Sequence, residues 1–219
     1  MTRDRMRQIA REHIARGDSL GWFEAVYREA RSTADAPPWA NRKPNVNLTA
    51  WLERNPNPQG TACVVGCGFG DDAAELARIG LNVTAFDISP TAIEVCTERF
   101  PHLSIHWEAH DLFSLPAAWE NSFDFVFEAN TLQVLPRVLR GGAFSAVINL
   151  VKPGGSLLVI ARARDEQEPE GDTPWPLTRA ELQSPDGFRT IMLEDFLDDE
   201  TPPVRRFRAL YLRNPHSPV

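Results

Sequence analysis

The stretch VVGCGFGDD, residues 64–72, places three glycines directly after an apolar run and two carboxylates directly after the glycines. Residues 61–65 (TACVV) have the composition of a buried strand, and residues 71–80 (DDAAELARIG) have the pattern of a helix that Gly80 closes. A glycine-rich turn between a strand and a helix lets a ligand approach the backbone where a Cβ would forbid it. We therefore expect a ligand to rest on residues 66–70.

Strands and helices alternate outward from this turn. Further strands are predicted at 81–87, 103–110, 123–129 and 156–162, with helices at 89–100 and 141–151 and a KPGG turn at 152–155. Ser89 is the expected cap of the first of these helices, with Pro90 at its first position. Two late strands, around 188–195 and 204–213, complete the chain. This alternation predicts an α/β fold with a doubly wound, mostly parallel, seven-stranded sheet.

The N-terminal part has a different pattern. Helical spacing predicts one helix through residues 6–14, ended by Gly17, and a second through 20–30 with Ser19 as its cap. Residues 32–45 read as a loop, and a short helix is expected at 46–55. We predict one structural domain with two parts, an N-terminal helical cap or lid (1–58) and a core (59–219), divided at the linker Asn55–Gln59.

Composition excludes several classes of protein. The net charge is −7, and no block of Lys or Arg is long enough to follow a phosphate backbone, so a nucleic-acid partner is not expected. The first 13 residues are charged throughout and no stretch approaches 18 apolar residues, so neither a signal peptide nor a membrane span is expected. The three cysteines lack C-x-x-C spacing and predict reduced thiols in a cytoplasmic protein.

The glycine turn also discriminates between two nucleotide ligands. A dinucleotide site uses G-x-G-x-x-G, with a pyrophosphate over the helix N-terminus. Here the sixth position is Asp71 and Asp72 follows, so an anionic pyrophosphate would be repelled. A nucleoside that carries an ammonium and a sulfonium would be attracted instead. The alternative is that these two carboxylates only complement the helix dipole.

Other acidic residues follow the later strands. Asp87 comes about 20 residues after Gly66, where a carboxylate accepts both hydroxyls of a ribose, in a NAD site as well. Asp111 could accept from an adenine amino group while Leu112 packs on the ring, although a turn cap is an equal alternative for Asp111. Glu128 ends the 123–129 strand region, at the edge of the sheet where reacting groups gather.

Taken in order and spacing, VVGCGFGDDA, VTAFDIS, HDLF, FDFVFEANTL and LVKPGGSLLVI resemble a class I S-adenosylmethionine-dependent methyltransferase over about residues 61–160, with its Rossmann-like sheet. Residues 22–53 and the loop GDTPWPLTRAEL are similar to the thiopurine, thiol/halide and tellurite-resistance methyltransferase group. The resemblance implies S-adenosylmethionine as cofactor, S-adenosylhomocysteine as product, a small-molecule acceptor, and a monomer or homodimer. It implies no metal.

The resemblance also implies a set of cofactor-binding residues. Asp72 would lie beside the methionine amino group, because Val64 stands where many class I enzymes have an acid. Trp39 would close over the cofactor or serve as a packing anchor. The full set is Trp39, Gly66, Cys67, Gly68, Gly70, Asp72, Asp87, Ile88, Asp111, Leu112, Glu128 and Asn130.

Fewer residues are candidates for the acceptor. Arg162 and Arg164 could hold an anionic group or pair with acids of the loop that follows; Trp22 and Trp175 complete the substrate candidates. Candidates for positioning the nucleophile are Glu128, His110 and Tyr27. Histidines recur at 102, 106 and 110, but in a strand that interval spans about 13 Å, too far for one metal ion.

The sequence thus favours in-line methyl transfer to a thiol or another soft nucleophile. An O- or N-methyltransferase of a specialised metabolite is the alternative within the class. A NAD-binding oxidoreductase is disfavoured by Asp71 and by the lack of a Tyr-x-x-x-Lys set. A cofactor-binding protein without catalysis is a third alternative, which the acidic residues disfavour.

Overall fold

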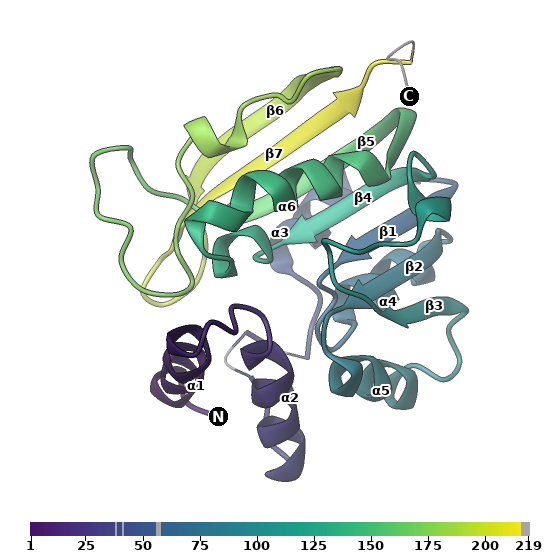
Figure 1. Ribbon diagram of the computed structural model, residues 1–219. Coiled ribbons are helices and arrows are strands. Elements are labelled where there is room, and N and C mark those ends of the chain that lie inside the picture. Colours follow the sequence, from purple (N-terminus) through teal and green to yellow (C-terminus); the bar gives the residue numbers. More distant parts are fainter. Residues whose placement is uncertain (38, 41, 56–57, 216–219) are drawn as a thin grey trace.

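The computed structural model describes residues 1–37, 39–40, 42–55 and 58–215 (Figure 1). Seven strands and six α-helices, with three short 3-10 helices, follow one another in these residues. In chain order they are α1 Arg3–Ala15, α2 Trp22–Ser32, α3 Val46–Arg54, β1 Thr61–Val65, α4 Asp71–Arg78, β2 Asn82–Asp87, α5 Pro90–Arg99, β3 Ile105–Ala109, η1 Ala117–Trp119, β4 Phe123–Ala129, η2 Leu132–Val134, α6 Arg137–Leu150, β5 Val151–Arg162, η3 Ala180–Leu182, β6 Phe188–Leu197 and β7 Arg205–Arg213.

All seven strands form one sheet in the order β3-β2-β1-β4-β5-β7-β6. The first five strands run parallel, and β7 is antiparallel to both of its neighbours. This arrangement confirms the predicted α/β class with a mostly parallel seven-stranded sheet. The carboxyl ends of β1 to β5 therefore meet the start of β7 along one edge.

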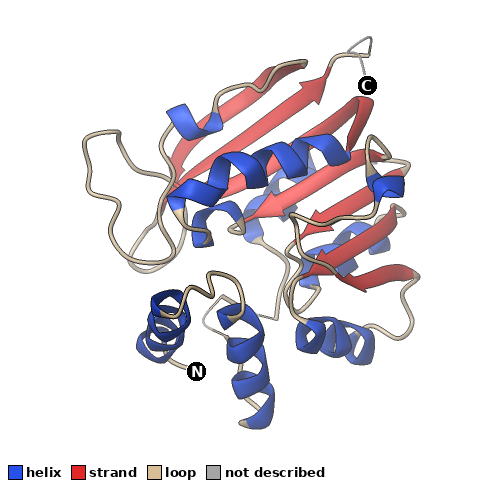
Figure 2. Ribbon diagram, in the orientation of Figure 1, coloured by secondary structure: helices blue, strands red, loops and turns tan. Residues whose placement is uncertain are grey.

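Apolar side chains on both faces of β1 explain why the sheet is covered on both sides. Cys63 and Val65 belong to a core cluster shared with α6, whereas Ala62 and Val64 belong to a cluster shared with α3 and α4. Because side chains alternate along a strand, an uninterrupted apolar run produces two buried faces. Figure 2 shows the sheet between these helical layers.

The cap helices α1 and α2 lie beside the carboxyl ends of the central strands, outside the two helical layers (Figure 1). Their apolar faces form a small cluster around Met6, Ile9, Trp22 and Val26, with Val134 of η2 packed against it. Helix α2 also contacts α5 of the core. The cap therefore roofs the edge where the parallel strands end.

Local details differ from the predicted elements in three places. The N-cap of α2 is Gly21 and not the predicted Ser19, and no side chain caps this helix; the Gly21 N–H itself donates to Oδ1 of Asp18 at 2.7 Å. Helix α6 begins at Arg137 and not at the predicted Gly141, because packing of its later residues overrides the weak helix propensity of the two glycines. The predicted KPGG turn lies within β5 as an irregularity in its pairing with β4.

Two other predictions meet the limits of the described residues. The predicted linker Asn55–Gln59 includes residues 56–57, which lie outside the described part of the chain, as do residues 38 and 41 of the predicted loop 32–45. Two predicted helix ends are confirmed. Ser89 caps α5, because its Oγ accepts from the Ala92 N–H, and Gly17 follows the end of α1 with a φ of 81°. Among the described helices, none is both long and apolar enough to cross a membrane.

Candidate active site

A cavity of about 610 Å³ lies at the carboxyl edge of the sheet, under the cap. In an open α/β sheet this edge is where ligands bind. Most of the predicted site residues line this cavity: Trp22, Tyr27, Trp39, Gly66, Cys67, Gly68, Asp72, Asp87, Ile88, His110, Asp111, Leu112, Asn130 and Arg162. Four predicted residues do not line it: Gly70, Glu128, Arg164 and Trp175.

The glycines of the turn have different reasons for lacking a side chain. Gly66 and Gly68 have φ values of 59° and 56°, in the left-handed region. A Cβ on Gly66 would lie 2.3 Å from Oγ1 of Thr131, whereas a Cβ on Gly68 would lie 3.0 Å from the hydroxyl of Tyr27. Gly70 faces Trp107, 2.6 Å from its would-be Cβ, so its space is filled by the core. Gly68 is therefore the glycine that keeps the backbone open beneath the cap.

Asp87 is the most buried carboxylate of the cavity wall, with 6% of its surface exposed. Its Oδ2 accepts from the Gly68 N–H at 2.9 Å and its Oδ1 accepts from the Ser89 N–H at 3.0 Å. Burial raises the pKa of Asp87 to about 6, although these two backbone donors oppose the shift. Each oxygen keeps a lone pair, so the group can still accept from a ligand.

Asp72 and Asp71 separate into two roles. Asp71 forms a bidentate pair with Arg99, with both contacts at 2.7 Å. Asp72 accepts from the Asn45 N–H at 2.6 Å and pairs with no cation in the described part of the chain. Burial raises the pKa of Asp72 to about 6. Of the two carboxylates, only Asp72 is therefore available to pair with a cationic group of a ligand.

The end of β3 contributes a third carboxylate. Asp111 lines the cavity and its Oδ1 accepts from the Phe113 N–H at 2.9 Å, the turn-capping contact expected as an alternative. The adjoining His110 also lines the cavity, and its Nε2 lies 2.6 Å from Oε2 of Glu108. Asp111 pairs with no cation among the described residues. Capping and ligand contact are compatible here, because the second carboxylate oxygen remains available.

Aromatic residues of the cap cover the glycine turn. Trp39 Nε1 donates to the Tyr27 hydroxyl at 2.9 Å, and the two rings meet edge to face with centroids 5.8 Å apart. Burial raises the pKa of Tyr27 well above its ordinary value, so the phenol stays neutral. Trp22 is almost fully buried and stacks on Phe23 at 3.9 Å. Trp39 therefore acts as a packing anchor that also borders the cavity.

The opposite end of the cavity is lined by arginines from three elements. These are Arg3 of α1, Arg162 at the end of β5 and Arg206 of β7. Burial lowers the pKa of Arg162, and the charges of Arg206 and Arg3 lower it further, whereas the nearby carboxylates of Glu200 and Asp198 oppose the shift. Arg206 pairs with Asp198 at 2.6 Å and also with Glu200. Among the described residues, the guanidinium groups of Arg162 and Arg3 have neither a carboxylate partner nor a hydrogen-bond acceptor.

A hydrogen-bonded amide network supports this arginine cluster. Gln133, 2% exposed, accepts from the Arg162 N–H at 2.7 Å and donates to Oδ1 of Asn130 at 2.9 Å. The same oxygen of Asn130 accepts from Arg206 at 3.4 Å. The predicted residue Asn130 therefore lies between the two arginines of the sheet.

Glu128 lies beneath the cavity and not on its wall. The side chain is fully buried, and its Oε1 accepts from the Thr131 and Leu132 N–H groups at 2.6 and 3.0 Å. Burial raises its pKa to about 7. Because β4 alternates, Glu128 turns into the core and supports Thr131, which contacts the would-be Cβ of Gly66.

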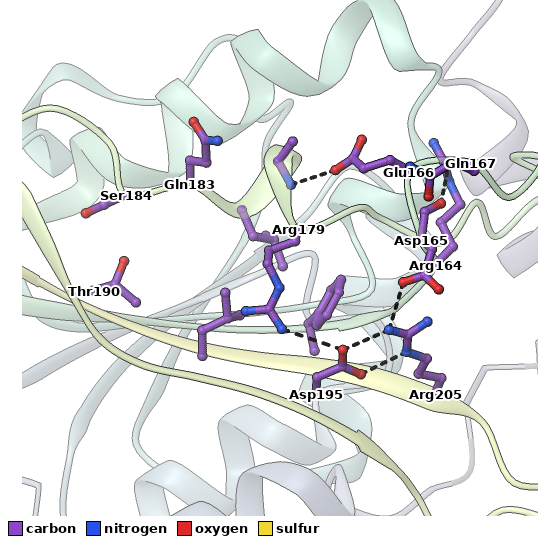
Figure 3. A pocket seen from close by; sticks show the side chains of 14 residues that line it. Arg164, Asp165, Glu166, Gln167, Arg179, Gln183, Ser184, Thr190, Asp195 and Arg205 are labelled. Atoms are coloured by element: carbon purple, nitrogen blue, oxygen red, sulfur yellow. Dashed lines mark hydrogen bonds and ion pairs between the residues drawn. The ribbon is translucent and has the colours of Figure 1, made fainter.

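Arg164 lines a second cavity of about 510 Å³, shown in Figure 3. Its guanidinium donates to the Pro176 and Glu168 carbonyls at 3.1 and 2.9 Å, so it holds the loop together and does not face the first cavity. Arg205 in this cavity pairs with Asp165 and Asp195. Arg205 and Arg179 in this cavity are thus paired with carboxylates, unlike Arg162 of the first cavity.

Trp175 is likewise structural in its described contacts. Its backbone N–H donates to the Gln133 carbonyl at 2.7 Å, and the Arg140 guanidinium lies 5.7 Å from its ring centroid.

Sequence reasoning missed two arginines of the cavity, Arg3 and Arg206, and the sequence marks them to different degrees. A charge inside an apolar alternating strand could have marked Arg206, whereas nothing local distinguishes Arg3 from the other charges of its helix.

Comparison with known proteins gives the arrangement a context. A family model described as a methyltransferase domain matches residues 63–155. A probable thiol methyltransferase 2 of Arabidopsis thaliana is 28% identical over 198 residues, which cover 86% of this chain and 82% of the relative. A thiopurine S-methyltransferase of Vibrio atlanticus is 24% identical over 176 residues, with 71% and 78% covered.

A solved structure shows the same fold. The 1,6-didemethyltoxoflavin-N1-methyltransferase of Burkholderia thailandensis, with bound 1,6-didemethyltoxoflavin and S-adenosylhomocysteine, superposes with a TM-score of 0.67. Its sequence identity is 16%, and the match covers 88% of this chain and 85% of that chain. At this identity the likeness establishes the architecture alone.

Proposed function

Because this chain is a class I S-adenosylmethionine-dependent methyltransferase of the group that includes thiol and thiopurine enzymes, we propose that it methylates a small acceptor through a soft, anionic nucleophile, above all a thiolate. One observation carries the proposal. Within the described residues, a single cavity has three carboxylates without a cation partner at one end, Asp72, Asp87 and Asp111, and two guanidinium groups without a carboxylate partner at the other, those of Arg162 and Arg3, beside Arg206, which is paired with Asp198 and Glu200.

The carboxylate end suits the cofactor. Asp87 would accept the ribose hydroxyls, Asp72 would face the methionine ammonium, and Asp111 would accept from the adenine amino group. Apolar contacts from Ile88 and Leu112 would border the adenine faces. Gly68 leaves the necessary space, since a side chain there would approach Tyr27. When bound, S-adenosylmethionine supplies an electrophilic methyl group on a sulfonium.

The arginine end suits an anionic acceptor. Arg3, Arg162 and Arg206 outnumber Asp198 and Glu200 at this end, and Arg162 has no carboxylate partner, so the remaining positive charge would lower the pKa of a thiol and favour its thiolate. Side chains of Leu20, Trp22, Phe23, Val134 and Leu135 provide an apolar wall next to it. Removing water from an anionic nucleophile raises its reactivity, and alignment of the reacting atoms supplies much of the remaining acceleration.

A thiolate acceptor needs no protein base, which agrees with the candidates available. The Tyr27 phenol is neutral, and Glu128 lies outside the cavity wall. His110 is the exception, because Glu108 orients its ring and the residue lines the cavity. This pair supports a second candidate function, methylation of an oxygen or nitrogen acceptor with His110 as base.

Hydride transfer with a NAD cofactor fits this site poorly. Asp71 occupies the position of the third glycine of the dinucleotide motif and is committed to Arg99. A pyrophosphate at the start of α4 would face the charge of Asp72 as well. The charges at this turn therefore favour a cationic nucleoside.

The test is release of S-adenosylhomocysteine from S-adenosylmethionine across a panel of thiols, thiopurines, halides, phenols, amines and carboxylic acids. We expect turnover with thiols or other soft anions, and its loss in the Asp87→Asn variant. Turnover with phenols or amines alone would contradict the thiolate proposal and support the His110 alternative. An unchanged rate in Asp87→Asn would contradict the assignment of the carboxylate end.

A further inference from the structure

A carboxylate of the cap, Glu24, is bonded to the start of a core helix. Its Oε2 accepts from the Ser89 hydroxyl at 2.5 Å and from the Thr91 N–H at 3.3 Å, and its Oε1 accepts from the Thr91 hydroxyl at 2.7 Å. Ser89 is fully buried and Thr91 is 9% exposed. These three hydrogen bonds join α2 to α5 at one point.

The N-terminus of α5 depends on this contact. The first N–H groups of a helix lack partners within the helix, and a nearby negative charge stabilises them. Pro90 has no N–H, the Ala92 N–H donates to Ser89 Oγ, and the Thr91 N–H donates to Glu24. No acidic residue lies in the first turn of α5 itself. The cap therefore supplies the carboxylate that this turn lacks.

The same serine connects Glu24 to the carboxylate end of the cavity. While the Ser89 hydroxyl donates to Glu24, the Ser89 N–H donates to Oδ1 of Asp87 at 3.0 Å. Asp87 also holds the Gly68 N–H. A movement of Ser89 would thus be transmitted to Asp87 and to the glycine turn.

On the other side, Glu24 sets the position of Tyr27. The two residues are three apart in α2 and so share one face of the helix. The Tyr27 hydroxyl lies 3.0 Å from the place of a Cβ on Gly68 and accepts from Trp39. A rotation or shift of α2 would therefore move Tyr27 away from the glycine turn and from its hydrogen bond with Trp39.

We propose that Glu24 is a positioning residue of the cofactor site, which aligns Asp87 through Ser89 and holds Tyr27 over the glycine turn. The part of this inference that concerns cofactor affinity rests on the proposed function. The part that concerns the attachment of α2 to α5 stands on the hydrogen bonds alone. No role of Glu24 toward the acceptor is required.

Other contacts keep the cap attached when Glu24 is changed. Trp22 and Val26 belong to an apolar cluster with α1, and Val134 of η2 packs against that cluster. Arg31 at the far end of α2 pairs with Glu94 and Glu98 of α5 at 2.5 and 2.6 Å. Since these ion pairs join the same two helices but are largely exposed, Arg31→Ala is a matched control.

The experiment compares the wild type with Glu24→Ala, Glu24→Gln and Arg31→Ala. Calorimetry gives the Kd for S-adenosylhomocysteine, initial rates separate KM for S-adenosylmethionine from kcat, and hydrogen exchange without cofactor reports on residues 22–32. For Glu24→Ala we expect a rise of about tenfold in Kd and in KM for the cofactor, because hydrogen bonds to a charged group are lost. The kcat at saturating cofactor should change by less than about twofold, since the reacting groups are intact.

The variants should fall in an order. Glu24→Gln keeps an acceptor oxygen without its charge and should lie between wild type and Glu24→Ala, whereas Arg31→Ala should change Kd by less than about twofold. Faster exchange in α2 should accompany the weaker binding. A folded Glu24→Ala protein with wild-type Kd would overturn the inference about affinity. If the wild type itself bound no S-adenosylhomocysteine, the proposed function would fail, and exchange in α2 would then decide the attachment: unchanged exchange in Glu24→Ala would overturn it too.

Discussion

The two ends of the main cavity are built in opposite ways. At the carboxylate end, the buried Asp87 and the partly buried Asp72 are hydrogen-bonded to backbone N–H groups, which fix them without neutralising them. At the arginine end, Arg206 is paired with Asp198 and Glu200, but the guanidinium of Arg162 has no hydrogen-bond acceptor or carboxylate partner among the described residues. Buried charges without partners raise the energy of a fold unless a ligand compensates them. This contrast is the basis of our proposal of a cationic ligand at one end and an anionic ligand at the other.

Removing Asp87 should have the largest effect on this contrast. The Asp87→Ala variant loses an acceptor for two hydroxyls, so its Kd for S-adenosylhomocysteine should rise at least about hundredfold, measured by calorimetry. Asp124→Ala is the control, because Asp124 is held by Thr61 and Lys152 at the other end of the strands and lines neither cavity described above. That control should lose stability but keep its Kd. A Kd within about threefold of wild type in Asp87→Ala would show that the carboxylate end does not hold the ribose.

Removing Arg162 should affect the other end alone. In Arg162→Ala we expect KM for an anionic thiol to rise about thirtyfold, while the Kd for S-adenosylhomocysteine stays within about twofold, because charge-assisted contacts to the acceptor are lost. The control is Arg164→Ala, whose guanidinium faces the second cavity. Equal effects of the two substitutions on KM would remove the distinction between the cavities.

Acidification from pH 7 to pH 5 should weaken cofactor binding at the carboxylate end by at least about tenfold, because Asp87 and Asp72 both have a pKa raised to about 6. Burial holds the pKa of Asp87 at about 6, above its ordinary value, so without cofactor the folded protein keeps this proton up to about pH 6. The same raised pKa means that this group's contribution to folding stability falls as pH rises from about 4 to about 6. Binding requires the ionised form, so affinity should increase with pH through about 6. Calorimetric Kd values for S-adenosylhomocysteine at pH 5, 6 and 7 test this; an affinity that is flat or greater at pH 5 would contradict it.

Neutralising Asp111 should have the smallest effect. Asp111→Asn keeps an acceptor for the Phe113 N–H, and its loss of charge at a partly exposed position should raise the Kd for S-adenosylhomocysteine only about threefold. Equilibrium dialysis with S-adenosylhomocysteine, carried out on Asp111→Asn and on Asp87→Ala, compares the two Kd values and so ranks the two carboxylates. A larger loss in Asp111→Asn than in Asp87→Ala would reverse the roles that we assign to them.

The two ends also differed in how far the sequence predicted them. Asp72, Asp87 and Asp111 each follow a strand within a short segment, and the parallel alternation alone brings such strand ends together. Helix caps could also be predicted from adjacent residues, as the Ser89 cap of α5 shows. These residues are close in the fold for reasons that adjacent sequence contains.

The arginine end depends on long-range pairing that no local pattern contains. Arg206 joins Arg162 because β7 inserts antiparallel between β5 and β6, with Arg162 opposite Arg206 in the register. Arg3 lies near the N-terminus of the chain, on α1 of the cap, far in sequence from the other two arginines. The sequence also could not show that the alternation of β4 turns Glu128 into the core, away from the cavity wall. Strand order and the docking of the cap are tertiary properties, so the sequence predicted Arg162 but neither Arg206 nor Arg3.

The most direct test of the account measures S-adenosylhomocysteine formation from S-adenosylmethionine with benzenethiol, phenol and aniline, three acceptors that share one ring. The account predicts turnover of benzenethiol with a kcat/KM at least about hundredfold above the other two, because only the thiol reaches the cation-rich end as a soft anion at neutral pH. Preference for phenol or aniline, equal turnover of all three, or no methylation of benzenethiol by protein that binds S-adenosylhomocysteine would contradict it.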